Sequence, residues 1–236
     1  PGKNLIFFFS ADEEIGSKTA LPHLSSIASS CGNVLCLEPS LPGGKVKTFR
    51  KGVGRFDIRV EGIPSHAGVD HETGANAIQE LSRLVLHLQG LTDYARGITV
   101  NVGKIQGGTA SNVVPALCEA EVDFRVATVA DGRWLESVVH SVQPVDHRCK
   151  IQIQGGLERP PLERTPAVIA LYQKARELAS SVGMDLGEGS TGGGSDGSFT
   201  AAMGIPTLDG LGVQGDGAHA LHEHIVVDDI ARRTAL

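Results

Sequence analysis

The pattern of apolar and polar positions predicts a strand, a helix and a second strand at the start of the chain. Residues 4–10 and 34–37 are short apolar runs bounded by turn residues, a pattern typical of buried strands. Residues 17–30, between them, carry leucine and isoleucine at helical spacing. This order predicts an α/β layer built on a mostly parallel sheet that is flanked by helices.

From residue 53 onward the pattern changes to one typical of an inserted domain. Alternating apolar and polar positions predict strands over 55–61, 98–106, 117–127 and 150–154. Helical spacing of apolar residues predicts helices over 74–88 and 133–142. The resulting βαββαβ order is that of a ferredoxin-like domain. We therefore predict an inserted domain over residues 53–160 that divides the first domain into residues 1–52 and 161–236.

The second part of the first domain is predicted to begin after a proline-rich linker. Residues 166–182 form an amphipathic pattern with Pro166 at the start, where proline is favoured in helices. Residues 191–197 predict a glycine-rich turn, and residues 205–208 predict a short buried strand. The turn and the strand thus complete the discontinuous α/β domain.

Composition and charge exclude several classes of function. The 236 residues are 41% hydrophobic and 20% charged, with a net charge of −6. Without a cluster of lysine and arginine, the sequence does not predict a nucleic-acid partner. No apolar run approaches the roughly 18 residues of a membrane span, so no membrane partner is predicted.

Cysteine spacing and the chain ends bear on location. Four cysteines without CxxC pairing predict free thiols rather than a zinc ribbon or a disulfide scaffold. Free thiols favour a cytoplasmic location. The chain begins at Pro1 without an initiator methionine, so we expect an N-terminally truncated chain, and periplasmic or secreted locations stay open.

Three segments carry residues suited to metal chemistry. Glu13 and Glu14 follow the first predicted strand, and Glu38 ends the second. In parallel sheets, ligand sites lie beyond the carboxyl ends of the strands, and carboxylates gathered there repel one another unless a cation offsets them. His219 lies with His222 and His224 in a glycine-rich loop, a pattern that suits metal binding. Taken singly, each segment is also explained by solvated acids or surface histidines.

Six motifs occur in order along essentially the whole chain: ADEEIGS, LEPS, GIPSHAG, GGTASNVVP with DFR, GGSD and GAH. Together they resemble the family of co-catalytic zinc aminoacylases and carboxypeptidases. That family includes glutamate carboxypeptidase, acetylornithine deacetylase and succinyl-diaminopimelate desuccinylase. The wording is most similar to the glutamate carboxypeptidase branch. The resemblance implies a zinc-peptidase-like α/β domain with an inserted ferredoxin-like dimerisation domain.

The resemblance also implies a metal centre and a catalytic base. Glu13 resembles the general base that takes a proton from a metal-bound water, and Glu14 resembles a ligand of one zinc ion. Glu38 and His219 resemble the carboxylate and imidazole ligands of the other zinc ion. The implied cofactors are two zinc ions per full-length subunit, with cobalt or manganese as alternatives.

Further positions resemble substrate-binding residues. His66 resembles the inserted-domain histidine that reaches the active site of a partner subunit and polarises the scissile carbonyl. Asn112 and Arg125 resemble the pair that holds the substrate carboxylate, and Gly194 and Ser195 resemble a loop lining the substrate pocket. The implied partners are a second copy of the chain and a small peptide or N-acyl amino acid. Singly, these residues are also explained as turn or exposed-strand positions.

The sequence departs from the family pattern in one respect. The family has an HxD motif and a bridging aspartate before its DEE motif, and no residue of these types precedes Asp12. We therefore expect this chain to bind fewer than two zinc ions, or none, and to be inactive by itself.

The resemblance predicts a hydrolase that cleaves an amide bond next to a free carboxylate. Two alternatives stay open: an N-acyl amino-acid deacylase of the same family, and a non-catalytic dimerisation or binding module. Phosphate binding by residues 192–195 is disfavoured because the loop lacks the lysine and spacing of a P-loop.

Overall fold

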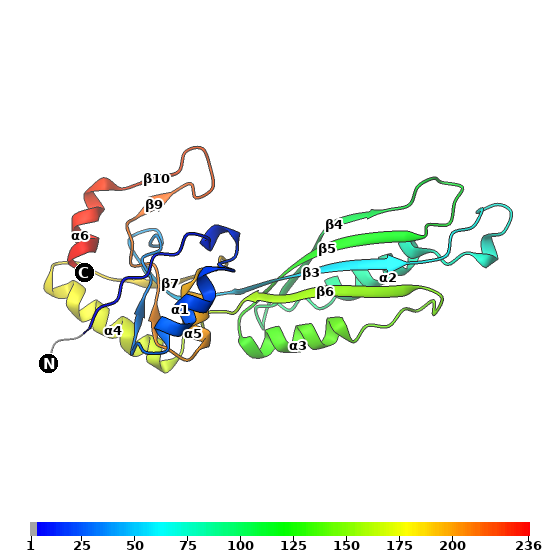
Figure 1. Cartoon of the computed structure of the whole chain (residues 1–236). Helices are drawn as coiled ribbons and strands as arrows, with labels where there is room; N and C mark the ends of the chain where they lie inside the picture. Colours follow the sequence, from blue (N-terminus) through cyan, green and yellow to red (C-terminus); the bar gives the residue numbers. More distant parts are fainter. Residues whose placement is uncertain (1–3) are drawn as a thin grey trace. The chain divides into compact units, whose positions relative to one another are not determined.

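A computed structural model describes residues 4–236, and the chain divides into two compact units (Figure 1). The first unit joins the residues up to Lys51 to the segment Arg159–Leu236, and the second comprises Gly52–Glu158. Both units mix helices and strands, which confirms the predicted α/β class.

The second unit has the predicted βαββαβ order. Its elements are β3 (Gly52–Glu61), α2 (Ala77–Gln89), β4 (Thr99–Gly107), β5 (Leu117–Val126), α3 (Val129–His140) and β6 (Lys150–Arg159), with a 3-10 turn at His71–Thr73. The strands form one sheet in the order β4-β5-β3-β6. β5 runs antiparallel to both β3 and β4, as the ferredoxin-like pattern predicts (Figure 1).

The core of this unit follows from the periodicity of its elements. In β5 the side chains of Ala120, Val122 and Phe124 are buried, whereas the acids between them face outward. Leu81 and Leu88 of α2 pack into the same apolar cluster. Alternate residues of a strand face opposite sides of a sheet, so one face of β5 is covered by helices and the other carries charge.

The first unit is built from shorter elements. They are a 3-10 turn (Glu13–Ile15), α1 (Ala20–Ala28), β1 (Val34–Leu35), β2 (Val46–Arg50), α4 (Pro166–Ser181), β7 (Glu188–Thr191), α5 (Gly197–Ala202), β8 (Thr207–Leu208), β9 (Gly215–Asp216), β10 (His224–Ile225), a 3-10 turn (Val227–Asp229) and α6 (Ile230–Ala235). β1 pairs with β8 and β2 with β7, both in parallel, and β9 pairs with β10 in antiparallel. The expected parallel sheet is thus present, within residues 4–236, as short two-stranded pairs.

Helix α4 covers the strands that lead to the candidate site. It begins at Pro166, and the Thr165 side chain accepts a hydrogen bond from Val168 N at 3.3 Å, which caps the first turn. Tyr172 is buried against Val46 of β2, and its hydroxyl donates to the Leu186 carbonyl at 2.9 Å. This packing fixes β2 and β7, whose ends carry site residues.

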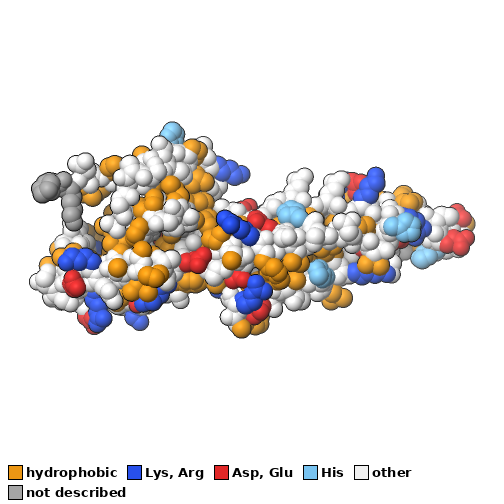
Figure 2. Space-filling view, turned by 90° about the horizontal axis from the view of Figure 1, so that it is seen from below, with side chains coloured by type: hydrophobic (Ala, Val, Ile, Leu, Met, Phe, Trp, Pro, Cys, Tyr) orange, Lys and Arg blue, Asp and Glu red, His pale blue; other side chains and the backbone are white. Residues whose placement is uncertain are grey.

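The prediction of a buried strand over residues 4–10 is wrong. This segment has no regular secondary structure, and Leu5, Phe7 and Phe9 are 72%, 69% and 89% exposed. The second predicted strand is shortened to β1, and Leu37 beyond it is 70% exposed. A strand needs hydrogen-bonding neighbours and a covering layer, which an apolar pattern does not itself supply. Hydrophobic side chains consequently reach the surface of this unit (Figure 2).

Two predictions from composition can be compared directly with the structure. All four cysteines are free thiols, and Cys118 and Cys149 are buried. Within residues 4–236 every helix is too short or too polar to cross a lipid bilayer.

Candidate functional site

The acidic motif forms a tight loop at the start of the first unit. Gly16 adopts a left-handed conformation, with φ of 98°, and its N–H donates to the Glu13 carbonyl at 3.0 Å. Buried Asp12 accepts hydrogen bonds from the Thr19 hydroxyl at 2.6 Å and the Thr19 N–H at 2.8 Å, and these lower the pKa of its carboxyl. Asp12 therefore holds the loop in place, and Glu13 and Glu14 make their contacts with other segments.

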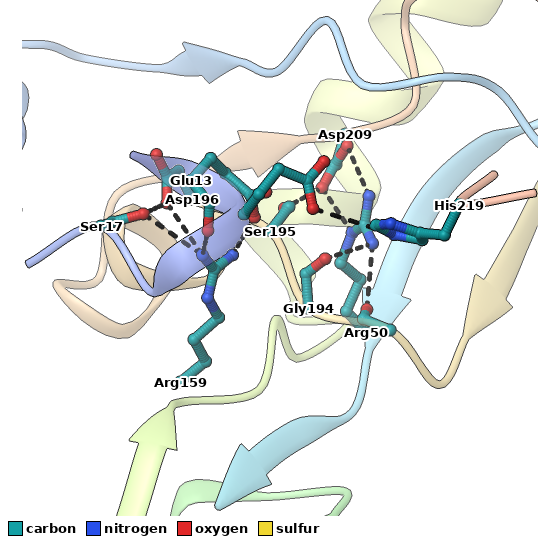
Figure 3. Close-up of polar contacts among 11 residues, drawn as sticks. Glu13, Ser17, Arg50, Arg159, Gly194, Ser195, Asp196, Asp209 and His219 are labelled. Atoms are coloured by element: carbon teal, nitrogen blue, oxygen red, sulfur yellow. Dashed lines mark hydrogen bonds and ion pairs between the residues drawn. The ribbon is translucent and has the colours of Figure 1, made fainter. Parts of the chain in front are cut away.

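Two of the three predicted metal ligands lie together. Glu14 Oε2 is 3.8 Å from His219 Nε2, and these side chains are 76% and 77% exposed. His219 is labelled in Figure 3. His219 has a φ of 64°, a left-handed conformation in the loop that connects β9 and β10. The structure thus brings a carboxylate and an imidazole from segments 205 positions apart, as 219 − 14 gives, into one place.

Glu38, the third predicted ligand, is half-buried just beyond β1. Burial raises the pKa of its carboxyl, the negative charge of Asp209 raises it further, and Arg50 partly offsets both. The charge of Glu13 acts in the same direction as that of Asp209. A carboxylate whose charge is disfavoured in this way is a position where a bound cation would be stabilising.

The donor atoms suit zinc, but the described residues do not form a complete zinc site. Carboxylate oxygen and imidazole nitrogen are ordinary zinc ligands. Within residues 4–236, however, no three histidine, cysteine, aspartate or glutamate side chains gather closely enough to hold a metal ion. The pair of Glu14 and His219 is thus a partial donor set, to which Glu38 is the predicted addition.

The predicted general base, Glu13, is engaged by an arginine. The Arg159 guanidinium forms an ion pair with the Glu13 carboxylate and donates to the Glu13 carbonyl at 2.5 Å (Figure 3). The same guanidinium donates to Ser17 Oγ at 3.2 Å and lies 3.6 Å from Asp196 Oδ1. Arg159, which is only 11% exposed, therefore ties the acidic loop to the end of the glycine-rich loop.

A second arginine organises the glycine-rich loop itself. Arg50, at the end of β2, forms a buried ion pair with Asp209, with Nε 2.6 Å from Oδ2. Arg50 Nη1 donates to the carbonyls of Gly193 and Gly194 at 2.9 and 2.8 Å (Figure 3). The predicted pocket residue Ser195 is fully buried, and its hydroxyl donates to Asp209 at 2.5 Å. Its side chain therefore points into the protein interior.

In the inserted unit, two of the three predicted substrate residues lie together. The segments carrying His66 and Asn112 form an isolated β-bridge between His66 and Val113, and Ala67 N donates to the Asn112 carbonyl at 2.9 Å. The His66 side chain is exposed, and its ring accepts a hydrogen bond at Nδ1 from Gly68 N at 3.1 Å. The other ring nitrogen, Nε2, is not used in this hydrogen bond. The backbones of the two segments are thus adjacent.

Arg125 is not part of this group. Asn112 lies before the start of β5, whereas Arg125 lies eight residues beyond Leu117 along that strand. At roughly 3.4 Å per residue, these eight residues span about 27 Å. Arg125 forms an ion pair with Asp123, with Nη2 2.9 Å from Oδ2. Within one chain, Asn112 and Arg125 therefore lie far apart along β5.

Sequence reasoning missed Arg50, Asp209 and Arg159. Their positions at strand ends could have pointed to them. Arg50 is the last residue of β2, Arg159 is the last residue of β6, and Asp209 is the first residue after β8. Charged residues at such positions need a partner if they are buried. The identity of the partner, however, is a property of the tertiary structure.

Comparison with known proteins supports the resemblance seen in the motifs. Residues 48–143 match the M20 peptidase dimerisation domain. The chain is 30% identical to carboxypeptidase G2 from Pseudomonas sp. (strain RS-16), over 95% of the chain and 55% of that protein. It is 26% identical to a succinyl-diaminopimelate desuccinylase from Paracidovorax citrulli, over 98% of the chain and 61% of that protein.

Solved structures share the fold at lower identity. The aminopeptidase PepT from Bacillus cereus matches with a TM-score of 0.79 and 19% identity, over 96% of the chain and 60% of that structure. The Bacillus subtilis YXEP protein, described as a dinuclear metal binding peptidase of the M20 family, matches with a TM-score of 0.63 and 18% identity, over 96% of the chain and 62% of that structure. The resemblance predicted from the motifs is confirmed, and the chain spans little more than half the length of these relatives.

Proposed function

We propose that the protein is a zinc-dependent hydrolase that cleaves an amide bond next to a free carboxylate. The premise is the match of residues 48–143 to the M20 peptidase dimerisation domain and the similarity of the chain to carboxypeptidase G2 and to succinyl-diaminopimelate desuccinylases. The observation that carries this proposal is the meeting of Glu14 and His219 beside Glu13. Carboxylate and imidazole are the donor types that hold zinc in metal-dependent hydrolases, and a second carboxylate beside them is suited to act as a base.

The roles in this proposal follow from the positions of the side chains. Glu14, Glu38 and His219 would hold zinc, which when bound supplies a Lewis acid and an acidified water. Glu13 lies in the acidic loop, where its carbonyl accepts a hydrogen bond from Gly16 N, and its carboxylate accepts a proton from the attacking water. Arg159 keeps the Glu13 carboxylate ordered within the first unit. His66, in the inserted unit, donates to the developing oxyanion.

Metal binding by this chain is the first test. The three candidate ligands fall short of two four-coordinate zinc sites, so we expect fewer than two zinc ions per chain after zinc loading and gel filtration, measured by mass spectrometry of metals. The variant H219A should lose the zinc that remains, whereas H222A, in the same loop, should keep it. Equal zinc content in the two variants would remove His219 from the ligand set.

Catalysis is tested on the full-length protein with a panel of substrates. The panel contains peptides ending in glutamate, N-acyl amino acids and N-succinyl amines, because the relatives include both a carboxypeptidase and a desuccinylase. We expect zinc-dependent hydrolysis of at least one class, and E13Q should lower kcat by about 10²-fold or more. The exposed control E177Q should not change kcat.

The panel also distinguishes the alternatives. Preference for acylated amino acids over peptides would identify an N-acyl amino-acid deacylase. If zinc-loaded full-length protein hydrolyses none of the panel, the hydrolase proposal fails, and the non-catalytic dimerisation or binding module becomes the better interpretation.

The substrate carboxylate is a separate point. We propose that Asn112 contacts the substrate of one site together with His66, and that Arg125, at the other end of β5, binds the carboxylate of a substrate in the other site of a dimer. The variant R125Q should raise KM for carboxylate substrates, while R59Q, an ion-paired arginine on a neighbouring strand, should not. Equal KM values for the two variants would exclude Arg125.

We also propose that the inserted domain joins two copies of the chain, as the name of the matching domain suggests. Light scattering during gel filtration should then give the mass of a dimer. If His66 acts on the partner subunit's site, mixing full-length H66A and E13A proteins should restore part of the activity. No recovery would place His66 in the site of its own chain.

A further inference from the structure

Arg50 lies where three segments of the first unit meet. The strand β2 is hydrogen-bonded to β7 on one side, in a register that places Arg50 opposite Thr191. On its other side, Lys47 N donates to the Asp209 carbonyl at 2.7 Å. Arg50 is therefore the last residue of a strand whose two neighbours lead into the glycine-rich loop and into Asp209.

The Arg50 side chain forms hydrogen bonds both with Asp209 and with the glycine-rich loop. Its Nε and Nη2 lie 2.6 and 3.3 Å from the two Asp209 oxygens, a fork-to-fork ion pair. Its Nη1 donates to two successive carbonyls, of Gly193 and Gly194. Arg50 is 3% exposed and Asp209 is completely buried, so these contacts replace the water that both charges have lost.

From the opposite side, Ser195 completes the network. Its buried hydroxyl donates to the Asp209 oxygen that also receives Arg50 Nε. Three successive loop residues, Gly193 to Ser195, are thus bound to one charged pair. The loop contains no side chain larger than serine between Thr191 and Asp196, so it has little packing of its own to fix it.

We propose that Arg50 and Asp209 are positioning residues that hold the glycine-rich loop in its substrate-binding conformation. In a trans peptide the C=O and the following N–H point in opposite directions. Because Arg50 binds the carbonyl of Gly193, the N–H of Gly194, which belongs to the same peptide and is partly exposed, points away from Arg50. The loop thereby presents the Gly194 N–H, in a fixed orientation, to an oxygen acceptor of the substrate, while buried Ser195 anchors the loop from the inside.

This inference rests on the proposed function only for the role of the loop, so the test needs one measurement that does not involve activity. Hydrogen exchange of peptides covering residues 188–199, measured by mass spectrometry, reports the order of the loop. The variants are R50K, which keeps the positive charge but loses the guanidinium fork, and S195A, which removes one hydroxyl. Two mild variants ensure that a folded protein is available for the measurement.

A matched control lies in the same unit. Arg233 forms a buried ion pair with Asp229, with Nε 3.2 Å from Oδ2, and also donates to a glycine carbonyl, that of Gly44. The variant R233K therefore loses the same chemical contacts at a place remote from the loop in the sequence. We expect R50K to speed exchange in residues 188–199 by roughly tenfold over wild type, and R233K to leave it unchanged.

Kinetics of the full-length protein provide the second measurement. A disordered loop binds substrate more weakly, so R50K should raise KM about tenfold while kcat changes less than threefold. A purely structural role would lower the active fraction, and with it the apparent kcat, without changing KM. R233K should show wild-type KM.

The two proposals can fail independently. If exchange and KM of R50K match those of R233K, the positioning role is refuted while the hydrolase remains. If the full-length protein is inactive but exchange in residues 188–199 is selectively faster in R50K, the hydrolase proposal fails and Arg50 still orders the loop.

Discussion

Replacing Glu80 by alanine should destabilise the inserted unit more than any nearby surface substitution. Glu80 lies in the first turn of α2 and is 3% exposed. Its carboxylate accepts hydrogen bonds from Val145 N at 2.7 Å and from Asp146 N at 3.1 Å, which fastens the loop after α3 to α2. Arg83 adds a contact at 3.2 Å.

The magnitude follows from the hydrogen bonds that E80A removes. A hydrogen bond to a charged group contributes about 1.5–3 kcal/mol, so the two lost bonds set an upper limit of about 3–6 kcal/mol. Water that reaches exposed Val145 and half-buried Asp146 in the variant reduces this loss. The contact with half-exposed Arg83 adds little. E80Q keeps one acceptor oxygen and should lose about half as much. E72A, at an exposed position, should change the free energy of unfolding by less than about 0.5 kcal/mol.

The assay can be specific for this unit. Trp134 is the single tryptophan of the chain and lies in α3 of the inserted unit. Urea unfolding followed by its fluorescence therefore reports the stability of that unit. If E80A unfolds at the same urea concentration as E72A, the Glu80 hydrogen bonds do not fasten the loop, and the reasoning is refuted.

Three further predictions concern stability, pH and thiol reactivity. L81A removes a fully buried side chain and should cost about 2–5 kcal/mol in the same unfolding assay. The pKa of Asp131 is lowered, chiefly by the hydrogen bond from the Thr128 hydroxyl and then by Arg96. Asp131 therefore stabilises the fold at pH values above its ordinary pKa of 3.8. This stabilisation is lost as the pH falls through the lower pKa that Asp131 has in the folded state. The free energy of unfolding of D131N should therefore depend less on pH in acid. Burial, then neighbouring carboxylates, raise the pKa of the Cys36 thiol to about 12, so its alkylation at pH 8, followed by mass spectrometry, should be far slower than that of free cysteine; an equal rate would contradict its burial.

The inserted domain could be predicted because its signals are local. In β5 every second residue is apolar, and those residues are the ones that the structure buries. The apolar spacing that predicted a helix over 74–88 likewise corresponds to the core, because it places Leu81, Leu84 and Leu88 on the buried face of α2. The covering helices and the sheet use these periodicities directly, so pattern and structure agree.

The first unit was harder to predict because its elements depend on distant partners. Residues 4–10 have a pattern as apolar as that of a buried strand, yet they are exposed and irregular. Helix α5, which follows the glycine-rich turn, has only six residues and no clear periodicity, and was missed. Short elements receive most of their stability from packing rather than from their own sequence.

By itself, the sequence determined the mixed α/β class, the βαββαβ order and the resemblance to zinc hydrolases, since these depend on periodicity and on motifs along the chain. Only the tertiary structure decided that Glu14 meets His219, that Arg159 engages Glu13 and that Arg50 binds Asp209. It also separated Asn112 from Arg125 along β5. The physical reason is that a charged side chain is compatible with many partners of opposite charge. Its choice is made by the backbone elements that carry two residues, far apart in the chain, to within a few ångströms of each other.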